Sequence, residues 1–178
     1  MSSGNFSTQK QSGSFQTQEY SSKPLKSWRT LTFFKNNALM IRFELEKQSV
    51  YFSFSDKTSV NSYQSFNEGF VIKLDLLSLN ELLYCLSFSE PVNWESWREK
   101  NAVKYQINFS PFKLQSFNLT SKKSINREGY ALKLVVYSNK ETIKQFILSP
   151  YEFELVKDLL HAFRSRIIDQ FSLRTPPS

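Results

Sequence analysis

Hydrophobic and polar residues alternate with a period of two in several separate stretches of this chain. Such alternation is typical of β-strands that bury one face and expose the other. The stretches form two series, and residues 89–100 separate them. The first series predicts strands over 28–34, 39–46, 50–55 and 70–76, and the second predicts strands over 103–109, 112–119, 130–137 and 142–148.

Each series of strands is followed by a helix with the same start signal. Ser149 and Glu152 form a capping box, in which the hydroxyl accepts from the amide three residues on and the carboxylate reaches back. Pro150 falls at the first helical position, where its missing N–H is no loss. Ser78 and Glu81 repeat the box earlier in the chain. The predicted helices cover 79–87 and 150–171, and the second has an apolar face of Phe153, Val156, Leu160, Phe163 and Ile167.

The two series predict an α+β fold built from a duplicated unit of four strands and one helix. We expect two antiparallel four-stranded sheets packed with helices, each sheet having one face covered by one helix. The expected organisation is a Ser/Gln-rich disordered arm (1–26), one domain (27–172) and a tail (173–178). Within the domain lie repeat one (28–88), a crossover (89–100) with one helical turn at 94–98, and repeat two (101–171).

The net charge of +7 is unevenly distributed along the chain. Residues 38–101 hold six basic and nine acidic side chains, whereas residues 102–151 hold eight basic and two acidic ones. A basic excess concentrated on one set of strands is typical of a surface that meets a polyanion. The alternative is a basic protein whose charge only keeps it in solution.

The composition argues against catalysis and against several kinds of site. Four glycines leave little material for a phosphate-binding loop, and the single His161 and single Cys85 exclude most catalytic triads and metal sites. We therefore expect a non-enzymatic protein without a cofactor. No apolar run reaches the length of a membrane span, and one cysteine fits a reducing intracellular compartment. The acid-poor arm also fits an organellar transit peptide.

The polar faces of the predicted strands carry residues suited to nucleic acid. Lysine and arginine neutralise phosphates, amides hydrogen-bond base edges, and aromatic rings provide stacking platforms. Exposed stacking platforms favour single strands, because a duplex hides the faces of its bases. An antiparallel sheet also shows a polar face to water without any ligand. The outward residues are Arg42, Tyr51, Lys73, Lys104, Gln106, Lys113, Gln115, Lys133 and Tyr137.

Over residues 28–171 the chain resembles the Whirly family of single-stranded-DNA-binding proteins. The family carries a Lys-Gly-Lys-Ala-Ala-Leu motif between its first two strands, and Lys35-Asn36-Asn37-Ala38-Leu39 stands at that place without the glycine and the second lysine. The strand from Gly129 to Val136 resembles the family's seventh strand. The segment from Ile147 to Phe153 resembles the entry into its final helix.

The resemblance implies two perpendicular four-stranded sheets, with helices that pack subunits into a homotetramer. Single-stranded DNA would then run along sheet edges and between subunits, with little sequence preference. Kinetoplastid mitochondrial RNA-binding proteins share this architecture, so RNA binding or annealing is an alternative, as is a protein-interaction scaffold. A location in a mitochondrion, plastid or nucleoid would fit the family.

These patterns together assign candidate residues to nucleic-acid binding and to oligomerisation. The expected phosphate contacts are Lys35, Arg42, Lys73, Lys104 and Lys133. The expected stacking residues are Phe34, Tyr51 and Tyr137, and the expected polar contacts are Asn36, Asn37 and Gln106. The expected oligomerisation residues are Phe163, Ile167, Ile168 and Phe171, because the second helix carries more apolar surface than one core needs.

Overall fold

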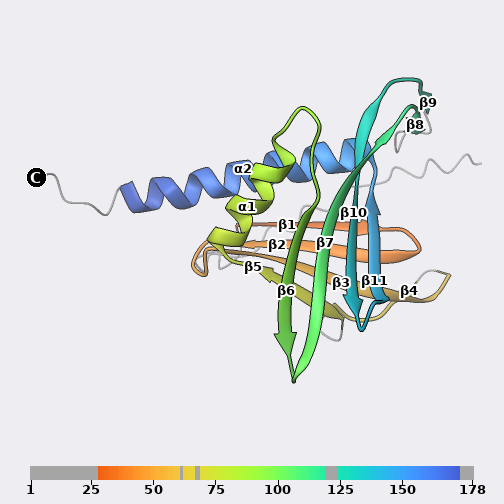
Figure 1. Cartoon of the computed structure of the whole chain (residues 1–178), viewed down its shortest axis with the longest axis horizontal. Coiled ribbons are helices and arrows are strands. Elements are labelled where there is room, and N and C mark those ends of the chain that lie inside the picture. The colour runs from red at the N-terminus through yellow and green to blue at the C-terminus, as the bar shows by residue number, and fades with distance from the viewer. Residues whose placement is uncertain (1–27, 61, 67–68, 119–123, 173–178) are drawn as a thin grey trace, which may run out of the picture.

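A computed structural model describes residues 28–60, 62–66, 69–118 and 124–172 of the chain (Figure 1). The predicted arm and tail lie outside these residues. The elements are β1 (Arg29–Phe34), β2 (Asn37–Glu44), β3 (Ser49–Ser59), β4 (Ser62–Tyr63), β5 (Phe70–Leu74), α1 (Leu76–Leu86), β6 (Trp94–Lys100), β7 (Val103–Leu114), β8 (Phe117–Asn118), β9 (Ser124–Ile125), β10 (Gly129–Ser138), β11 (Glu141–Leu148) and α2 (Pro150–Ser172).

The first sheet contains the strands that the first hydrophobic series predicts. Its order is β1-β2-β3-β5, with every neighbouring pair antiparallel, and the short β4 pairs with the far end of β3. The register places Leu31, Ile41, Phe52 and Ile72 in one row across the four strands. These four positions belong to the core or pack against it, so the predicted alternation is confirmed for this sheet.

The second sheet has the order β11-β10-β7-β6, and its membership differs from the prediction. The chain runs without a break through Pro111, so the predicted strand 103–109 and the start of the predicted strand 112–119 are one strand, β7, which ends at Leu114. Phe117 and Asn118 form the separate strand β8, which pairs with β9. The β6 ladder ends where Trp94 pairs with Phe109. Beyond Phe109, β7 therefore has an open edge on that side, and proline is tolerated at such an edge.

The fourth strand of this sheet, β6, occupies the segment predicted as a crossover with a helical turn. A two-residue turn joins it to β7, and both turn residues have left-handed backbone, with φ of 53° at Asn101 and 61° at Ala102. Such backbone matches the twist of a tight hairpin. The turn between β10 and β11 has the same form at Asn139 and Lys140. Because neither turn contains glycine, the usual sequence signal for a tight hairpin is missing.

The inner faces of the two sheets and both helices share one hydrophobic core. The strands of the second sheet run across those of the first, as the ribbon shows (Figure 1). The rings of Phe52 and Phe109 meet edge to face across the sheets at 5.1 Å, and Phe163 of α2 meets Phe43 of the first sheet at 5.4 Å. The expectation that each sheet has its own covering helix is therefore wrong, because α2 packs on β10 and β11 of the second sheet and, through Phe163, on Phe43 of the first.

Helix α1 begins three residues earlier than the repeated capping box predicts. Its N-cap is Asp75, whose carboxylate accepts from the amide of Ser78 at 2.9 Å. This backbone hydrogen bond is the main cause that lowers the pKa of Asp75 below its usual value. Ser78 is buried, and its hydroxyl accepts from Arg98 of β6 at 2.8 Å. An aspartate at the true cap thus leaves Ser78 inside the first turn.

Helix α2 follows the prediction closely. Its capping residue Ser149 donates its amide to the Glu152 carboxylate at 2.7 Å, as the box requires. The hydroxyl of Ser149 donates to the same oxygen at 2.8 Å, whereas the prediction has it accept from a backbone amide. Pro150 is the first helical residue, and the predicted apolar face from Phe153 to Ile167 is fully buried.

Candidate nucleic-acid interface

Apart from those in the turn between β1 and β2, the predicted binding residues lie on the outer faces of the two sheets. Arg42, Tyr51 and Lys73 stand in one row on the outer face of the first sheet, because they pair across β2, β3 and β5. The outer face of the second sheet carries Lys104, Gln106, Lys133 and Tyr137. Since the inner faces of both sheets meet in the core, these residues do not form one continuous patch.

On the first sheet, charged partners already surround the predicted stacking residue Tyr51. The Arg42 guanidinium lies 5.2 Å from the ring centre and the Lys47 ammonium lies 5.5 Å from it. Both cations also lie 2.8 Å from a carboxylate oxygen of Glu44, a buried residue. The hydrogen bond that Lys47 donates to the Glu44 carboxylate raises the pKa of Lys47. This face therefore offers less uncompensated positive charge than its lysines and arginine suggest.

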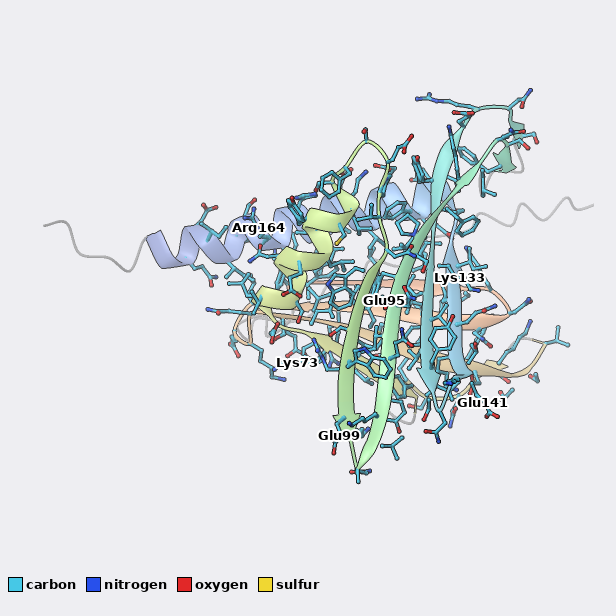
Figure 2. The ribbon with its side chains drawn as sticks, viewed as in Figure 1. Lys73, Glu95, Glu99, Lys133, Glu141 and Arg164 are labelled. Atoms are coloured by element: carbon cyan, nitrogen blue, oxygen red, sulfur yellow. The ribbon has the colours of Figure 1, made fainter. Side chains whose placement is uncertain are left out.

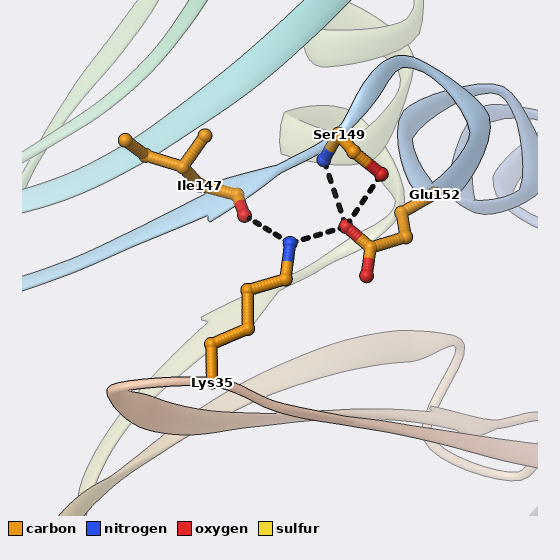
Figure 3. A network of polar contacts seen from close by, with 4 residues as sticks. All are labelled: Lys35, Ile147, Ser149 and Glu152. Atoms are coloured by element: carbon orange, nitrogen blue, oxygen red, sulfur yellow. Dashed lines mark hydrogen bonds and ion pairs between the residues drawn. The ribbon is translucent and has the colours of Figure 1, made fainter. Parts of the chain in front are cut away.

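The turn between β1 and β2 packs against the second sheet. Lys35 donates to the carbonyl of Ile147 at 2.8 Å and forms an ion pair with Glu152, so three donors meet at the Glu152 carboxylate (Figure 3). Its ammonium also lies 5.4 Å from the ring centre of Phe146. The predicted phosphate contact thus joins the first hairpin to β11 and to the start of α2.

The neighbours of Lys35 in this turn differ in exposure. Phe34 is 60% exposed, and its ring centre lies 5.1 Å from that of Tyr63. The Tyr63 hydroxyl donates to the carbonyl of Lys35 at 2.7 Å, which fixes the turn from its other side. Asn36 is exposed and Asn37 is half-buried at the start of β2. Of the predicted turn residues, Phe34 offers the largest open aromatic surface.

The outer face of the second sheet carries an exposed row of aromatic and amide side chains. Trp97 of β6 pairs with Gln106 of β7, which in turn pairs with Tyr137 of β10. Trp97 is 63% exposed, the largest exposed aromatic surface on this face. Lys104 is exposed beyond one side of the row, and Lys133 is half-buried beyond the other. The row therefore combines stacking surface and an amide. Lys104 lies next to it, and Lys133 lies farther along β10, beyond the row of Glu95, Asn108 and Val135.

Strand β6 also brings carboxylates to this face. Glu95 accepts from the side-chain amides of Gln106 at 3.2 Å and Asn108 at 3.0 Å. The amide of Gln106, predicted to contact bases, is thus engaged with a carboxylate. Glu99 lies further along β6, opposite Lys104 in the strand register. Both glutamates are labelled in Figure 2. The face is therefore mixed in charge, whereas the sequence interpretation treated it as basic.

Sequence reasoning missed Trp97 because it missed β6. In β6 the inward positions are Trp94, Ser96 and Arg98, and only the tryptophan of these is apolar. A count of hydrophobic alternation therefore gives almost no strand signal. The two tryptophans, a residue type that favours strands, and Asn101, which tolerates left-handed backbone, are the signals that could have indicated a hairpin strand.

A hollow of about 330 Å³ lies where the β5 edge of the first sheet meets the β6–β7 hairpin. Its lining includes Lys73, Arg98 and Tyr105, and Arg98 also borders a second hollow beside Trp97 and Lys104. The two hollows are neighbours, because Arg98 and Glu99 of β6 line both of them. Arg98 is fixed there by its donation to Ser96 and to α1.

The predicted oligomerisation residues separate into buried and exposed ones. Phe163 and Ile167 are fully buried inside this chain, so they belong to its own core and not to surplus surface. Ile168 is 42% exposed. Phe171 lies within α2, but its side chain is outside the described part. The remaining apolar surface on the helices includes Tyr84, Leu77 and Leu155.

The other chemically notable residues do not form a site. In the described part of the chain, no cluster of His, Cys, Asp or Glu could hold a metal ion. None of the helices described there is long and apolar enough to cross a membrane. Burial raises the pKa of the Cys85 thiol, and His161 is exposed on α2. Lys113 pairs with Glu128 at 2.7 Å, which raises the pKa of the lysine.

Comparison with solved structures shows the fold. The plant transcriptional regulator PBF-2 matches with a TM-score of 0.53 and 12% identity, over 85% of this chain and 87% of its own. WHY3 from Arabidopsis thaliana matches with a TM-score of 0.55 and 12% identity, over 82% of this chain and 92% of its own. WHY1 from Arabidopsis thaliana matches with a TM-score of 0.56 and 14% identity, over 85% of this chain and 100% of its own.

No protein-family model matches the sequence, and no curated protein matches it either. At 12–14% identity, the likeness to solved structures concerns the fold alone. The resemblance drawn from the sequence is confirmed at that level: the chain has a Whirly-like α+β fold with two antiparallel sheets.

Proposed function

We propose that this protein binds single-stranded DNA with low sequence specificity and, without catalysis, protects or organises single strands. The observation that carries the proposal is the row of Trp97, Gln106 and Tyr137 on the outer face of the second sheet, with Lys104 next to it and Lys133 farther along β10 on the same face. The Whirly-like fold supports it, because Whirly proteins are known to bind single-stranded DNA.

The row favours single strands for a physical reason. A base that stacks on an exposed ring such as Trp97 must offer its face, and pairing and stacking inside a duplex hide that face. Stacking contributes about 1–3 kcal/mol per base, and each lysine on a phosphate adds an attraction that weakens with salt. Trp97 and Tyr137 are the proposed stacking residues, and Lys104 and Lys133 the proposed phosphate contacts.

The hollow beside Arg98 extends this surface toward the first sheet. A strand that leaves Trp97 and passes the β6 edge would reach Lys73, which lines the same hollow as Arg98. From Lys73 the row on the first sheet continues to Tyr51 and Arg42. We propose this order of contacts for a longer strand, with the single domain of residues 27–172 acting as one binding unit.

The test is a titration of single-stranded DNA, single-stranded RNA and duplex DNA of the same length and sequence at fixed salt. We expect single-stranded DNA to bind most tightly. Replacing Trp97 with alanine should weaken that binding by about fivefold or more, since one stacked base is lost. Tyr84→Ala removes another highly exposed aromatic, on α1, and should leave binding unchanged.

Two results would refute parts of the proposal. Equal affinity for duplex and single strand would exclude stacking as the basis of binding. Tighter binding of RNA than of DNA would agree with the proposed binding surface but show that single-stranded DNA is the wrong ligand.

We also propose a homo-oligomer, a tetramer by the family resemblance, held in part by the exposed side of α2. Ile168→Glu should then lower the mass measured by light scattering while the circular dichroism spectrum stays unchanged. An unchanged mass would contradict this role for Ile168.

A further inference from the structure

Glu95 places a negative charge in the middle of the surface that the proposed function assigns to a polyanion. Its neighbour on the same face of β6 is Trp97, and its partner across the sheet is Asn108. In the described part of the chain, no lysine or arginine forms an ion pair with Glu95. A carboxylate without a cationic partner repels phosphates, so it weakens non-specific binding.

The structure holds this carboxylate in a fixed orientation. Asn108 donates to one of its oxygens at 3.0 Å, and Gln106 donates to the other at 3.2 Å. Both amides project from β7, so the carboxylate is held from that side, and the residue stays exposed. A carboxylate oxygen can accept about two hydrogen bonds. Each oxygen therefore keeps capacity for one more donor from a ligand.

Two parallel acceptors select a ligand group with two adjacent donors. Among unpaired bases, guanine has that pattern, since its N1–H and its N2 amino group lie side by side on the Watson–Crick edge. Adenine and cytosine each place a ring acceptor beside their amino group, and thymine places carbonyls on both sides of its N3–H. A carboxylate would face these acceptors with like charge. A base stacked on Trp97 would present its edge toward Glu95, two positions along the strand.

We infer that Glu95 is a specificity-determining residue that recognises the Watson–Crick edge of an unpaired guanine at a subsite beside Trp97. This inference rests on the proposed function. It adds one base-selective position to a surface that is otherwise tolerant of sequence. It also reinforces the restriction to single strands, because a duplex engages the same guanine edge in pairing.

The experiment measures binding of the full chain to oligonucleotides of thymidine in which every third base is guanine, compared with oligothymidine of equal length. The wild-type protein should prefer the guanine-containing strand by about fivefold, the low end for a bidentate contact because Glu95 is exposed. Replacing guanine by hypoxanthine, which lacks the N2 amino group, should remove most of that preference. Replacing it by 7-deazaguanine, which keeps the Watson–Crick edge, should not.

Two variants separate recognition from charge. Glu95→Gln and Glu99→Gln each remove one carboxylate from the same face of β6, so both should bind oligothymidine more tightly. Only Glu95→Gln should lose the preference for guanine. Thermal unfolding checks that both variants fold, and the hypoxanthine comparison on the wild-type protein remains decisive if Glu95→Gln does not.

Failure of the inference differs from failure of the proposed function. A wild-type protein that binds both strands equally, or a Glu95→Gln variant that still prefers guanine, would overturn the role of Glu95 and leave single-strand binding intact. A wild-type protein that binds neither strand would overturn both.

Discussion

Replacing Lys35 with methionine tests whether this lysine stabilises the fold or contacts a phosphate. Methionine keeps most of the aliphatic stem but removes the ammonium, which donates to the Ile147 carbonyl at 2.8 Å and pairs with Glu152. The Lys35 side chain is 38% exposed and that of Glu152 is 13% exposed, so solvent screens the ion pair in part. We expect the free energy of unfolding to fall by about 1–2 kcal/mol, mostly from the charged hydrogen bonds.

A double-mutant cycle with Glu152→Gln isolates the pair. Glutamine can still accept from the Ser149 amide, so the cap survives while the charge is lost. We expect a coupling energy of about 0.5–1 kcal/mol between Lys35 and Glu152, smaller at high salt. Urea unfolding at one fixed protein concentration measures it, since any oligomer makes apparent stability concentration-dependent. In a chain of this size, a loss of about 1 kcal/mol lowers the Tm by about 2–4 °C.

Lys104→Met is the matched control, because Lys104 is exposed on the proposed binding face. This substitution should leave the free energy of unfolding unchanged. It should reduce by about 0.7 the magnitude of the slope of the log binding constant for single strands against log salt concentration. Lys35→Met should show the opposite pattern. If Lys35→Met instead unfolds like the wild type and lowers the salt slope, the structural role derived from Figure 3 is wrong and Lys35 is a phosphate contact.

Three further substitutions test the local geometry. Ala102→Gly should raise the free energy of urea unfolding by about 1 kcal/mol, because Ala102 has a φ of 61° that glycine adopts without strain; an unchanged value would argue against that turn. Gly69→Ala should lower the Tm and cost about 2 kcal/mol or more, since its Cβ would lie 1.9 Å from the carbonyl oxygen of Phe54. Asp75→Ala should lower the free energy of unfolding by about 1 kcal/mol at neutral pH. The pKa of Asp75 is lowered from 3.8 by the Ser78 amide, so its stabilisation is present above that value and is lost as the pH falls through the folded-state pKa. A cost for Asp75→Ala that persists in acid would contradict the capping role.

The two proposals for the second sheet depend on different features of one strand. Trp97 supplies stacking surface, which any base can use, whereas Glu95 supplies a fixed pair of acceptors, which few bases can satisfy. Affinity and base preference should therefore respond to different substitutions on β6. Trp97→Ala should weaken the binding of every single-stranded DNA, and Glu95→Gln should change the order of preference among DNA sequences.

The amino-acid sequence alone determined those elements whose signals are local. The strands of the first sheet follow from alternation, because every second residue of each strand faces the core. Helix α2 follows from Pro150, from the Ser149–Glu152 box and from apolar residues at helical spacing. In each case the residues that fix the conformation lie within a few positions of one another, so a single stretch contains the information.

Only the tertiary structure decided the make-up of the second sheet and of its outer face. Strand β6 has few apolar inward residues and a turn without glycine, so pairing with β7 identifies it as a strand, and hydrophobic alternation does not. That pairing brings Trp97 and Glu95 onto the face where Lys104, Gln106, Lys133 and Tyr137 were expected to act. Likewise, Lys35 meets Glu152 because two sheets cross. Contacts between residues so far apart in the chain depend on how whole elements pack, and no local pattern records that packing.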